Sequence, residues 1–213
     1  MRLRKVKNAY EKLKADTKYF VDKENNYKGR WKSVFNNDNP IHIEIGCGKG
    51  QFMMELAKKN PNINYVAIEK YDSVLLRVSE KANEYDIPNL RITIIDANEI
   101  SNYFDKGEVE RIYLNFSDPW PKNHHAKRRL TSKIFLDQYR LILSSNGEIH
   151  QKTDNRGLFE FSLESFNENG YGLKHISLDL HKDYEKYPFN ITTEFEDKWS
   201  KFGPIYRLEA YKK

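Results

Sequence analysis

The chain has 213 residues, of which 38% are hydrophobic and 14% aromatic, so it is long enough for one globular domain with a substantial core and too apolar to be disordered. No apolar run approaches the ~20 residues of a membrane helix, and the charged N-terminus lacks the apolar segment of a signal peptide. Because Cys47 is the one cysteine, no internal disulfide can form, and a cytoplasmic protein without a membrane partner is expected.

The net charge of +5 at pH 7 is unevenly distributed along the chain. Residues 1–32 hold eleven Lys and Arg against four Asp and Glu, whereas the remainder is slightly acidic. A second basic run, residues 122–129, contains four Lys or Arg, two His and no acid. Two basic segments suit a polyanionic partner, most simply nucleic acid, although a basic N-terminus alone could equally serve only solubility.

Residues 1–39 are predicted to form a basic N-terminal arm in front of a domain that spans residues 40–213. Residues 1–32 show no clean apolar period, so this arm is expected to be at most partly ordered without a partner. The turn-forming run Asn-Asn-Asp-Asn-Pro, residues 36–40, marks the start of the domain.

From residue 41 onward, predicted strands and helices alternate. Strands are expected at residues 41–45, 64–68, 90–95, 109–114 and 148–153, with helices at 51–59, 73–85, 98–104, 131–143 and about 157–167. Two last strands, at 173–178 and 204–211, are expected to pair antiparallel. This alternation predicts an α/β fold with a mainly parallel sheet, right-handed crossovers and helices on both faces.

The helical patterns also predict which side chains are buried. Ser73 is a candidate N-cap for the second helix. In the helix at 131–143, Ile134, Phe135, Tyr139 and Ile142 are expected to face the core.

Acidic residues recur at the ends of successive predicted strands. Glu69, Asp96 and Asp118 close the second, third and fourth strands, and Glu44 stands just before a glycine-rich turn. That turn reads Gly46-Cys47-Gly48-Lys49-Gly50, in which the third glycine comes one residue earlier than in the dinucleotide fingerprint. A carboxylate beside the turn repels phosphate and favours a ligand that carries an amine or a sulfonium.

The spacing of the acids suggests the rest of that ligand. Glu69 lies 23 residues after Gly46, where an acid can accept hydrogen bonds from ribose hydroxyls, and Asp96 could meet the exocyclic amine of adenine. These roles describe S-adenosylmethionine, with Gly46, Gly48, Gly50 and Asn115 completing the predicted cofactor site. Cys47 is predicted only to fill the turn, and the six histidines lack metal-ligand spacing, so no metal site is predicted.

The predicted centre of the chemistry is the stretch Asn115-Phe116-Ser117-Asp118-Pro119-Trp120-Pro121. Its prolines stop the preceding strand, so Asp118, the predicted catalytic residue, is held on a stiff turn at the sheet edge where ligands bind in open α/β folds. Trp120 could stack on a base or pack in the core. Thr131 is expected to cap the following helix rather than to contact substrate.

Several motifs resemble those of bacterial tRNA (guanine-N7-)-methyltransferases, which modify the guanine at position 46 in the variable loop. The matching segments are Glu44-Ile-Gly-Cys-Gly-Lys-Gly50, Asn115-Phe-Ser-Asp-Pro-Trp-Pro-Lys122, His125-Ala-Lys-Arg-Arg-Leu130, Lys152-Thr-Asp-Asn-Arg156 and Thr193-Glu-Phe-Glu196. The second of these is specific to the family, whereas the glycine motif is generic to methyltransferases. The resemblance implies a class I S-adenosylmethionine-dependent methyltransferase fold, Rossmann-like with seven strands, and a tRNA partner; it leaves monomer or homodimer open.

The resemblance also implies residue roles. By the match, Glu44, Glu69, Asp96 and Asp118 would line the methyl-donor pocket. Substrate contacts would come from Lys122, Asp154, Thr193, Glu194, Phe195 and Glu196, and RNA contacts from His124, His125, Lys127, Arg128 and Arg129.

Three other functions remain open from the residues. A methyltransferase acting on an exocyclic amine has a similar turn, but with two adjacent prolines before the aromatic residue. An RNA-binding protein with a vestigial pocket is disfavoured by the acids at every strand end. A nicotinamide-dependent oxidoreductase is disfavoured by the glycine spacing.

Overall fold

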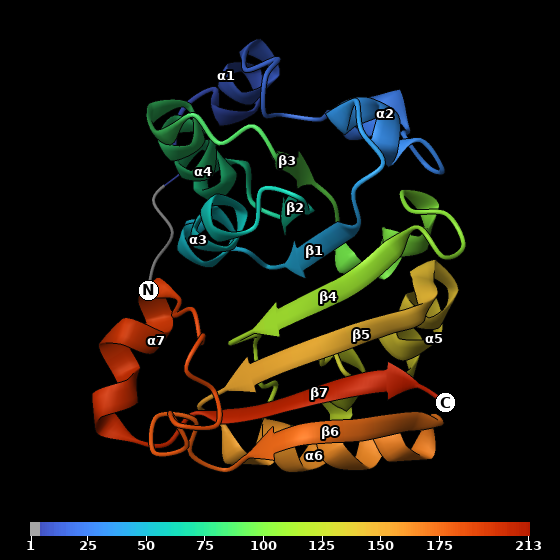
Figure 1. The fold of residues 1–213 in the computed structure, drawn as a ribbon, viewed down its shortest axis with the longest axis vertical. Coiled ribbons are helices and arrows are strands. Elements are labelled where there is room, and N and C mark those ends of the chain that lie inside the picture. Colours follow the sequence, from blue (N-terminus) through green and yellow to red (C-terminus); the bar gives the residue numbers. More distant parts are fainter. Residues whose placement is uncertain (1–4) are drawn as a thin grey trace.

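The computed structural model describes residues 5–213, so the first four residues of the predicted arm lie outside the described part. Seven strands form one sheet in the order β3-β2-β1-β4-β5-β7-β6 (Figure 1). The strands are β1 (Ile41–Ile45), β2 (Asn64–Glu69), β3 (Leu90–Ile94), β4 (Val109–Asn115), β5 (Leu143–Thr153), β6 (Tyr171–Ser177) and β7 (Tyr206–Lys212). Strands β1 to β5 pair parallel and β7 runs antiparallel to both of its neighbours, which confirms the predicted sheet.

Helices cover the sheet and its edges. The α-helices are α1 (Ala9–Ala15), α2 (Trp31–Phe35), α3 (Gln51–Lys59), α4 (Asp72–Tyr85), α5 (Lys133–Ile142), α6 (Arg156–Glu168) and α7 (Glu194–Trp199). Short 3₁₀ helices are η1 (Lys23–Asn25), η2 (Ala97–Asn102), η3 (Asn123–Arg128) and η4 (Ser200–Phe202). In Figure 1, α6 lies behind β6 and β7, while α7 lies beside the carboxyl ends of β4 and β5. Within residues 5–213, no helix is both long and apolar enough to span a membrane.

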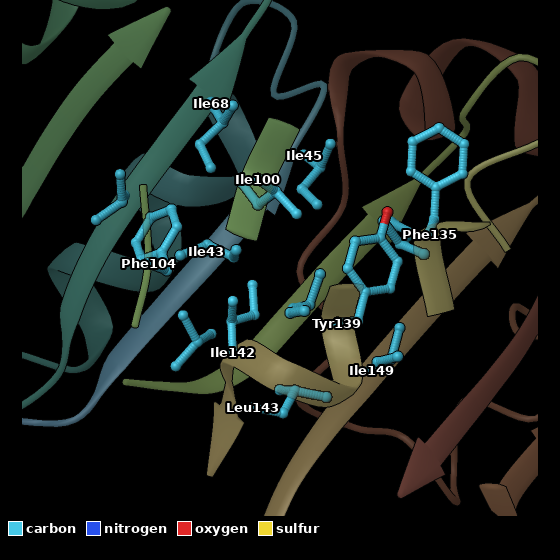
Figure 2. Close-up of a cluster of buried hydrophobic side chains, with 14 of the residues drawn as sticks. Ile43, Ile45, Ile68, Ile100, Phe104, Phe135, Tyr139, Ile142, Leu143 and Ile149 are labelled. Carbon is cyan, nitrogen blue, oxygen red and sulfur yellow. The ribbon is translucent and has the colours of Figure 1, made fainter. Parts of the chain in front are cut away.

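Strands β1 and β2, in the parallel part of the sheet, are buried on both faces. In β2, Val66 and Ile68 join the hydrophobic cluster on one face, while Tyr65 and Ala67 join the cluster on the other. Because side chains alternate along a strand, a nearly continuous apolar run supplies both clusters. Figure 2 shows the first cluster, in which side chains of α5 meet those of the central strands.

The N-terminal segment is integrated into the core, so the expectation of a loosely ordered arm was wrong for the described residues 9–35. Leu13 and Tyr19 are fully buried, and Phe20 forms a parallel β-bridge with Ile92 of β3. Trp31 stacks on Phe104 at a centroid distance of 5.0 Å. The apolar side chains come from several short elements in turn, and for that reason the segment shows no single helical period.

Two local predictions on helices were also wrong. Ile134 is 51% exposed, whereas the next two residues of α5, Phe135 and Leu136, face the core. The helix after β2 begins at Asp72, with Tyr71 as its N-cap, and the Ser73 hydroxyl instead accepts a hydrogen bond from the Val6 backbone at 2.9 Å. Phe135, Tyr139 and Ile142 are buried as predicted.

Candidate active site

A cleft of about 860 Å³ opens at the carboxyl ends of β1 to β4. The chain order reverses between β1 and β4, and ligands bind at such switch points in open α/β sheets. Eight residues predicted to bind cofactor or RNA line this cleft: Gly46, Gly48, Glu69, Asp96, Asn115, Asp118, Lys127 and Arg128. Residues far apart in sequence therefore converge on one sheet edge.

The glycine turn has two distinct functions. Gly46 and Gly48 have φ angles of 81° and 55°, and a Cβ on either would meet nothing within 4 Å. They therefore leave free space in the cleft. A Cβ on Gly50 would lie 2.6 Å from Val78 Cγ1, and Gly50 does not line the cleft. The third glycine permits close packing of α3 against α4.

Two acids at neighbouring strand ends are held differently. Glu69 Oε2 accepts a hydrogen bond from the Gly48 backbone at 3.2 Å, and Oε1 accepts one from the Lys70 backbone at 2.7 Å. Burial raises the pKa of Glu69 despite these bonds. Burial would also raise the pKa of Asp96, but Lys70 Nζ at 2.7 Å and bonds from Asn98 lower it below its usual range. Both carboxylates are fixed in direction.

Glu44 lies beneath the cleft and does not line it. Its Oε1 accepts a hydrogen bond from Asn115 Nδ2 at 2.8 Å. Its Oε2 is buried without a partner among residues 5–213. Burial raises the pKa of Glu44 to about 8, although Asn115 and Lys152 oppose that shift. An unsatisfied buried oxygen at this place could accept a hydrogen bond from a bound ligand.

The turn that carries Asp118 is strained and braced. Phe116 and Trp120 have φ angles of 51° and 42°, a region that residues with side chains rarely adopt. Arg129 donates to the Pro119 and Trp120 carbonyl oxygens, each at 3.0 Å. Such strain persists only where the surroundings hold it, and it concentrates at functional sites. Asp118 itself is exposed at the cleft.

Trp120 lines the cleft and is half-buried, rather than part of either core cluster. The Arg128 guanidinium lies 4.8 Å from its ring centroid, and the His125 ring approaches edge-on at 5.5 Å. The core-packing interpretation of Trp120 was therefore wrong, and base stacking stays a prediction.

The basic run divides into two groups. Lys127 and Arg128 are exposed and line the cleft, and His124 is exposed on η3. Arg129 faces inward, where it braces the turn and lies 4.4 Å from the Phe161 ring centroid. Thr131 is not the predicted cap, because Ser132 takes the N-cap position and the Thr131 hydroxyl bonds to Ser162 at 2.8 Å.

The predicted substrate segment 193–196 forms the start of α7. The Thr193 hydroxyl accepts a hydrogen bond from the Glu196 backbone at 3.0 Å. The Glu196 side chain is fully buried and pairs with Lys152 at 2.5 Å. Phe195 is exposed but contacts Phe116 of the turn that carries Asp118, with ring centroids 4.8 Å apart. Glu194 pairs with Lys81 at 3.2 Å, and Lys122 and Asp154 are exposed outside the cleft lining.

Lys152 is a site residue whose role the sequence did not indicate. It is buried, and its ammonium also donates to the Ile191 carbonyl at 2.8 Å. Burial lowers the pKa of Lys152, and Glu196 opposes that effect. The ion pair joins β5 to α7 beside a second cavity of about 270 Å³. A lysine within a buried strand was the available signal, but its partner lies forty-four residues away.

A second charged group lies on the sheet, on β5 and β7. Glu148, His150 and Glu209 bring ligand atoms within 4.8 Å of one another. Their carboxylates already pair with Lys174 and Arg207. The arrangement is an ion-pair network, and the expectation of no metal site stays a prediction.

Comparisons with known proteins agree on a family. Residues 38–208 match the sequence model of a family described as "Putative methyltransferase". The chain is 52% identical to a tRNA (guanine-N(7)-)-methyltransferase of Geobacillus sp. (strain WCH70), covering 99% of this chain and 95% of that protein. It is 53% identical to a protein of the same name from Streptococcus equi subsp. zooepidemicus, covering 99% of each.

Solved structures agree on the fold. The 16S rRNA methyltransferase KamB superposes with a TM-score of 0.64 at 13% identity, covering 87% of this chain and 94% of that one. An antibiotic-related methyltransferase gives a TM-score of 0.61 at 16% identity, covering 86% and 92%. The predicted class I methyltransferase fold is confirmed. Full-length relatives at more than half identity, and a cleft built from the predicted residues, show that the chain belongs to the tRNA (guanine-N(7)-)-methyltransferase family.

Proposed function

We propose that the protein transfers a methyl group from S-adenosylmethionine to N7 of a guanine in tRNA, at position 46 of the variable loop. The observation that carries the proposal is the cleft that gathers the glycine turn, Glu69, Asp96 and Asp118 at one sheet edge. Residues 40–213 supply this cleft, and the basic residues 1–39 are proposed to add affinity for RNA. Since the proposed substrate is tRNA, the proposed location of the protein is the cytoplasm. We propose that it acts as a monomer or a homodimer.

The residues of the cleft fit the methyl donor. Gly46 and Gly48 leave room for a ligand, and Asp96 and Glu69 offer carboxylates to an adenosine. The unpartnered oxygen of Glu44 would accept from the donor's ammonium group. When bound, the donor supplies an electrophilic methyl group.

The proposed reaction needs no general base. Guanine N7 has a lone pair and no proton, so no group has to deprotonate it first. The protein accelerates the reaction mainly by proximity, because it holds N7 in line with the methyl group. Positive charge grows on the purine as N7 is methylated. The Asp118 carboxylate, held on the braced turn, stabilises that charge through a preorganised electrostatic interaction.

We assign phosphate contacts to the basic run, through His124, His125, Lys127 and Arg128. Lys122 and Asp154 are proposed to contact the substrate, with Asp154 holding the edge of the guanine. In the segment 193–196, the burial of Glu196 favours an indirect role through Lys152, while Phe195 remains open to the substrate.

The test is to methylate bulk tRNA with the purified protein and to map the modified atom by mass spectrometry. We expect 7-methylguanine in the variable loop. A methyl group on an exocyclic amine would instead support the first alternative, and no methylation by a protein that binds the donor would support the vestigial-pocket alternative. Titration with NAD in place of the donor tests the oxidoreductase alternative, for which binding is not expected.

A further inference from the structure

Four residues of α7 and of the 3₁₀ helix η4 that follows it form an outward stripe. Phe195, Lys198, Trp199 and Phe202 follow the spacing i, i+3, i+4 and i+7, which places them on one face of a helical segment. The three aromatic side chains are 40%, 39% and 69% exposed. Large aromatics at this exposure indicate a surface for a partner when they are contiguous.

The rings are contiguous and lead into the active site. The Phe195 centroid lies 4.8 Å from that of Phe116 and 5.9 Å from that of Trp199, and Trp199 lies 5.5 Å from Phe202. Phe116 lines the cleft and stands two residues before Asp118. The series Phe116, Phe195, Trp199 and Phe202, here termed the aromatic track, therefore runs from the catalytic turn out to solvent. Figure 1 shows α7 beside the ends of β4 and β5, where this turn begins.

The acidic and the basic side chains near the aromatic track have different partners. The acids of α7 are paired elsewhere: Glu194 with Lys81, Glu196 with Lys152, and Asp197 as acceptor from Gln51 at 2.8 Å.

Two lysines instead accompany the exposed rings. Lys198 Nζ lies 4.9 Å from the Trp199 centroid, and Lys201 Nζ lies 5.2 Å from the Phe202 centroid. The accessible face of the track is thus aromatic and cationic.

We propose that the aromatic track is a stacking surface for unpaired nucleotides that flank the target guanine; this rests on the proposed tRNA methyltransferase function. Proteins that hold single-stranded nucleic acid combine aromatic platforms with a positive surround, because every base has a π-face and every nucleotide a phosphate. Continuity with Phe116 places such nucleotides next to the base in the cleft. The flanking lysines favour a polyanion over a second copy of this chain.

The first experiment measures tRNA affinity for Phe202→Ala, Phe202→Leu and Phe202→Trp. We expect about tenfold weaker binding for the alanine variant, on the scale of a lost base–aromatic stack. Leucine keeps an apolar side chain but no π-face, so it should behave like alanine, whereas tryptophan should restore wild-type affinity. Tyr85→Leu, at an exposed aromatic of α4 that is not part of the aromatic track, is the matched control and should bind normally. Wild-type affinity in Phe202→Ala would overturn the proposal.

The second experiment separates stacking from charge by a salt series. Phe202→Ala should lower log K at every salt concentration without changing its slope against log salt. Lys198→Ala and Lys201→Ala should each flatten that slope by about 0.7, the counterion term for single strands. Donor affinity should be unchanged in all three variants.

Two further outcomes would contradict the track as a nucleotide surface. If Phe202→Ala changes the sedimenting mass in the absence of RNA while Phe202→Leu does not, the surface joins two copies. If the wild type methylates guanine N7 but Phe202→Ala and an added Trp199→Ala variant both bind tRNA normally, the track fails and the proposed function stands. Absence of N7 methylation by the wild type would instead refute the proposed function itself.

Discussion

The guanidinium of Arg129 fixes the turn that carries Asp118, since it donates to the carbonyl oxygens of Pro119 and Trp120. A lysine cannot reproduce this two-pronged contact. We predict that Arg129→Lys lowers kcat by between about tenfold and a hundredfold, because a small displacement of Asp118, the proposed catalytic group, would be costly. The salt dependence of tRNA binding should stay unchanged. Single-turnover assays check this, with the exposed Arg77→Lys as control; a flattened salt slope with normal kcat would identify Arg129 as an RNA contact instead.

Glu44 gives the fold a specific pH dependence. Its pKa is raised by burial from 4.5 in the unfolded chain to about 8 in the folded protein. Between these values the folded state binds more protons than the unfolded state, so stability is greatest at low pH and falls as pH rises toward 8. The slope from this one group approaches about 1.4 kcal/mol per pH unit.

The measurement is chemical denaturation of wild type and Glu44→Gln, without donor, from pH 5 to pH 8. Glutamine does not titrate, so the stability of the wild type relative to the variant should decrease across this range. A difference that is constant with pH would show that Glu44 is ionised in the folded protein.

At the scale of elements, η3 presents the cationic surface that borders the cleft. Lys127 and Arg128 line the cleft, whereas Arg129 is used within the fold. We predict that neutralising the first two flattens the salt slope of tRNA binding by roughly 1.5 in total, at 0.7 to 0.9 per phosphate contact. Donor affinity should not change. Neutralising Lys58 and Lys59 at the end of α3 is the control. An equal change of the salt slope in that control would show that Lys127 and Arg128 contribute only nonspecific charge.

The strands could be predicted from the sequence better than the helices and the side-chain ion pairs, for a physical reason. Apolar runs such as residues 64–68 are buried on both faces, so composition alone marks them, and the acids that follow them reach one sheet edge by topology.

The short helix α7 was missed, although Thr193 and Glu196 have the spacing of a capping box. Its ion pair between Lys152 and Glu196 depends on a tertiary contact that no local pattern contains. Gly50 was grouped with the cofactor glycines because spacing does not reveal which neighbour a glycine faces.

At the scale of the whole molecule, the N-terminal segment and the catalytic domain share their core. Leu13 of α1 is fully buried in the same cluster as the helices α3 and α4. We predict that Leu13→Ala lowers the free energy of unfolding by about 2–5 kcal/mol, the usual cost of a cavity at a buried leucine. The exposed Lys12→Ala should change it by less than about 0.5 kcal/mol. If Leu13→Ala leaves global unfolding unaltered, the segment is a separable arm.

The central claim is that the Asp118 carboxylate, fixed at the cleft edge, stabilises the charge that develops on the methylated guanine. Single-turnover methyl transfer by Asp118→Asn, at saturating donor and tRNA, tests it most directly, because asparagine keeps the shape and removes the charge. We predict a rate at least about a hundredfold below wild type, the scale of a lost preorganised electrostatic contact, with the melting temperature and both binding constants close to wild type. A near-normal single-turnover rate would contradict the claim.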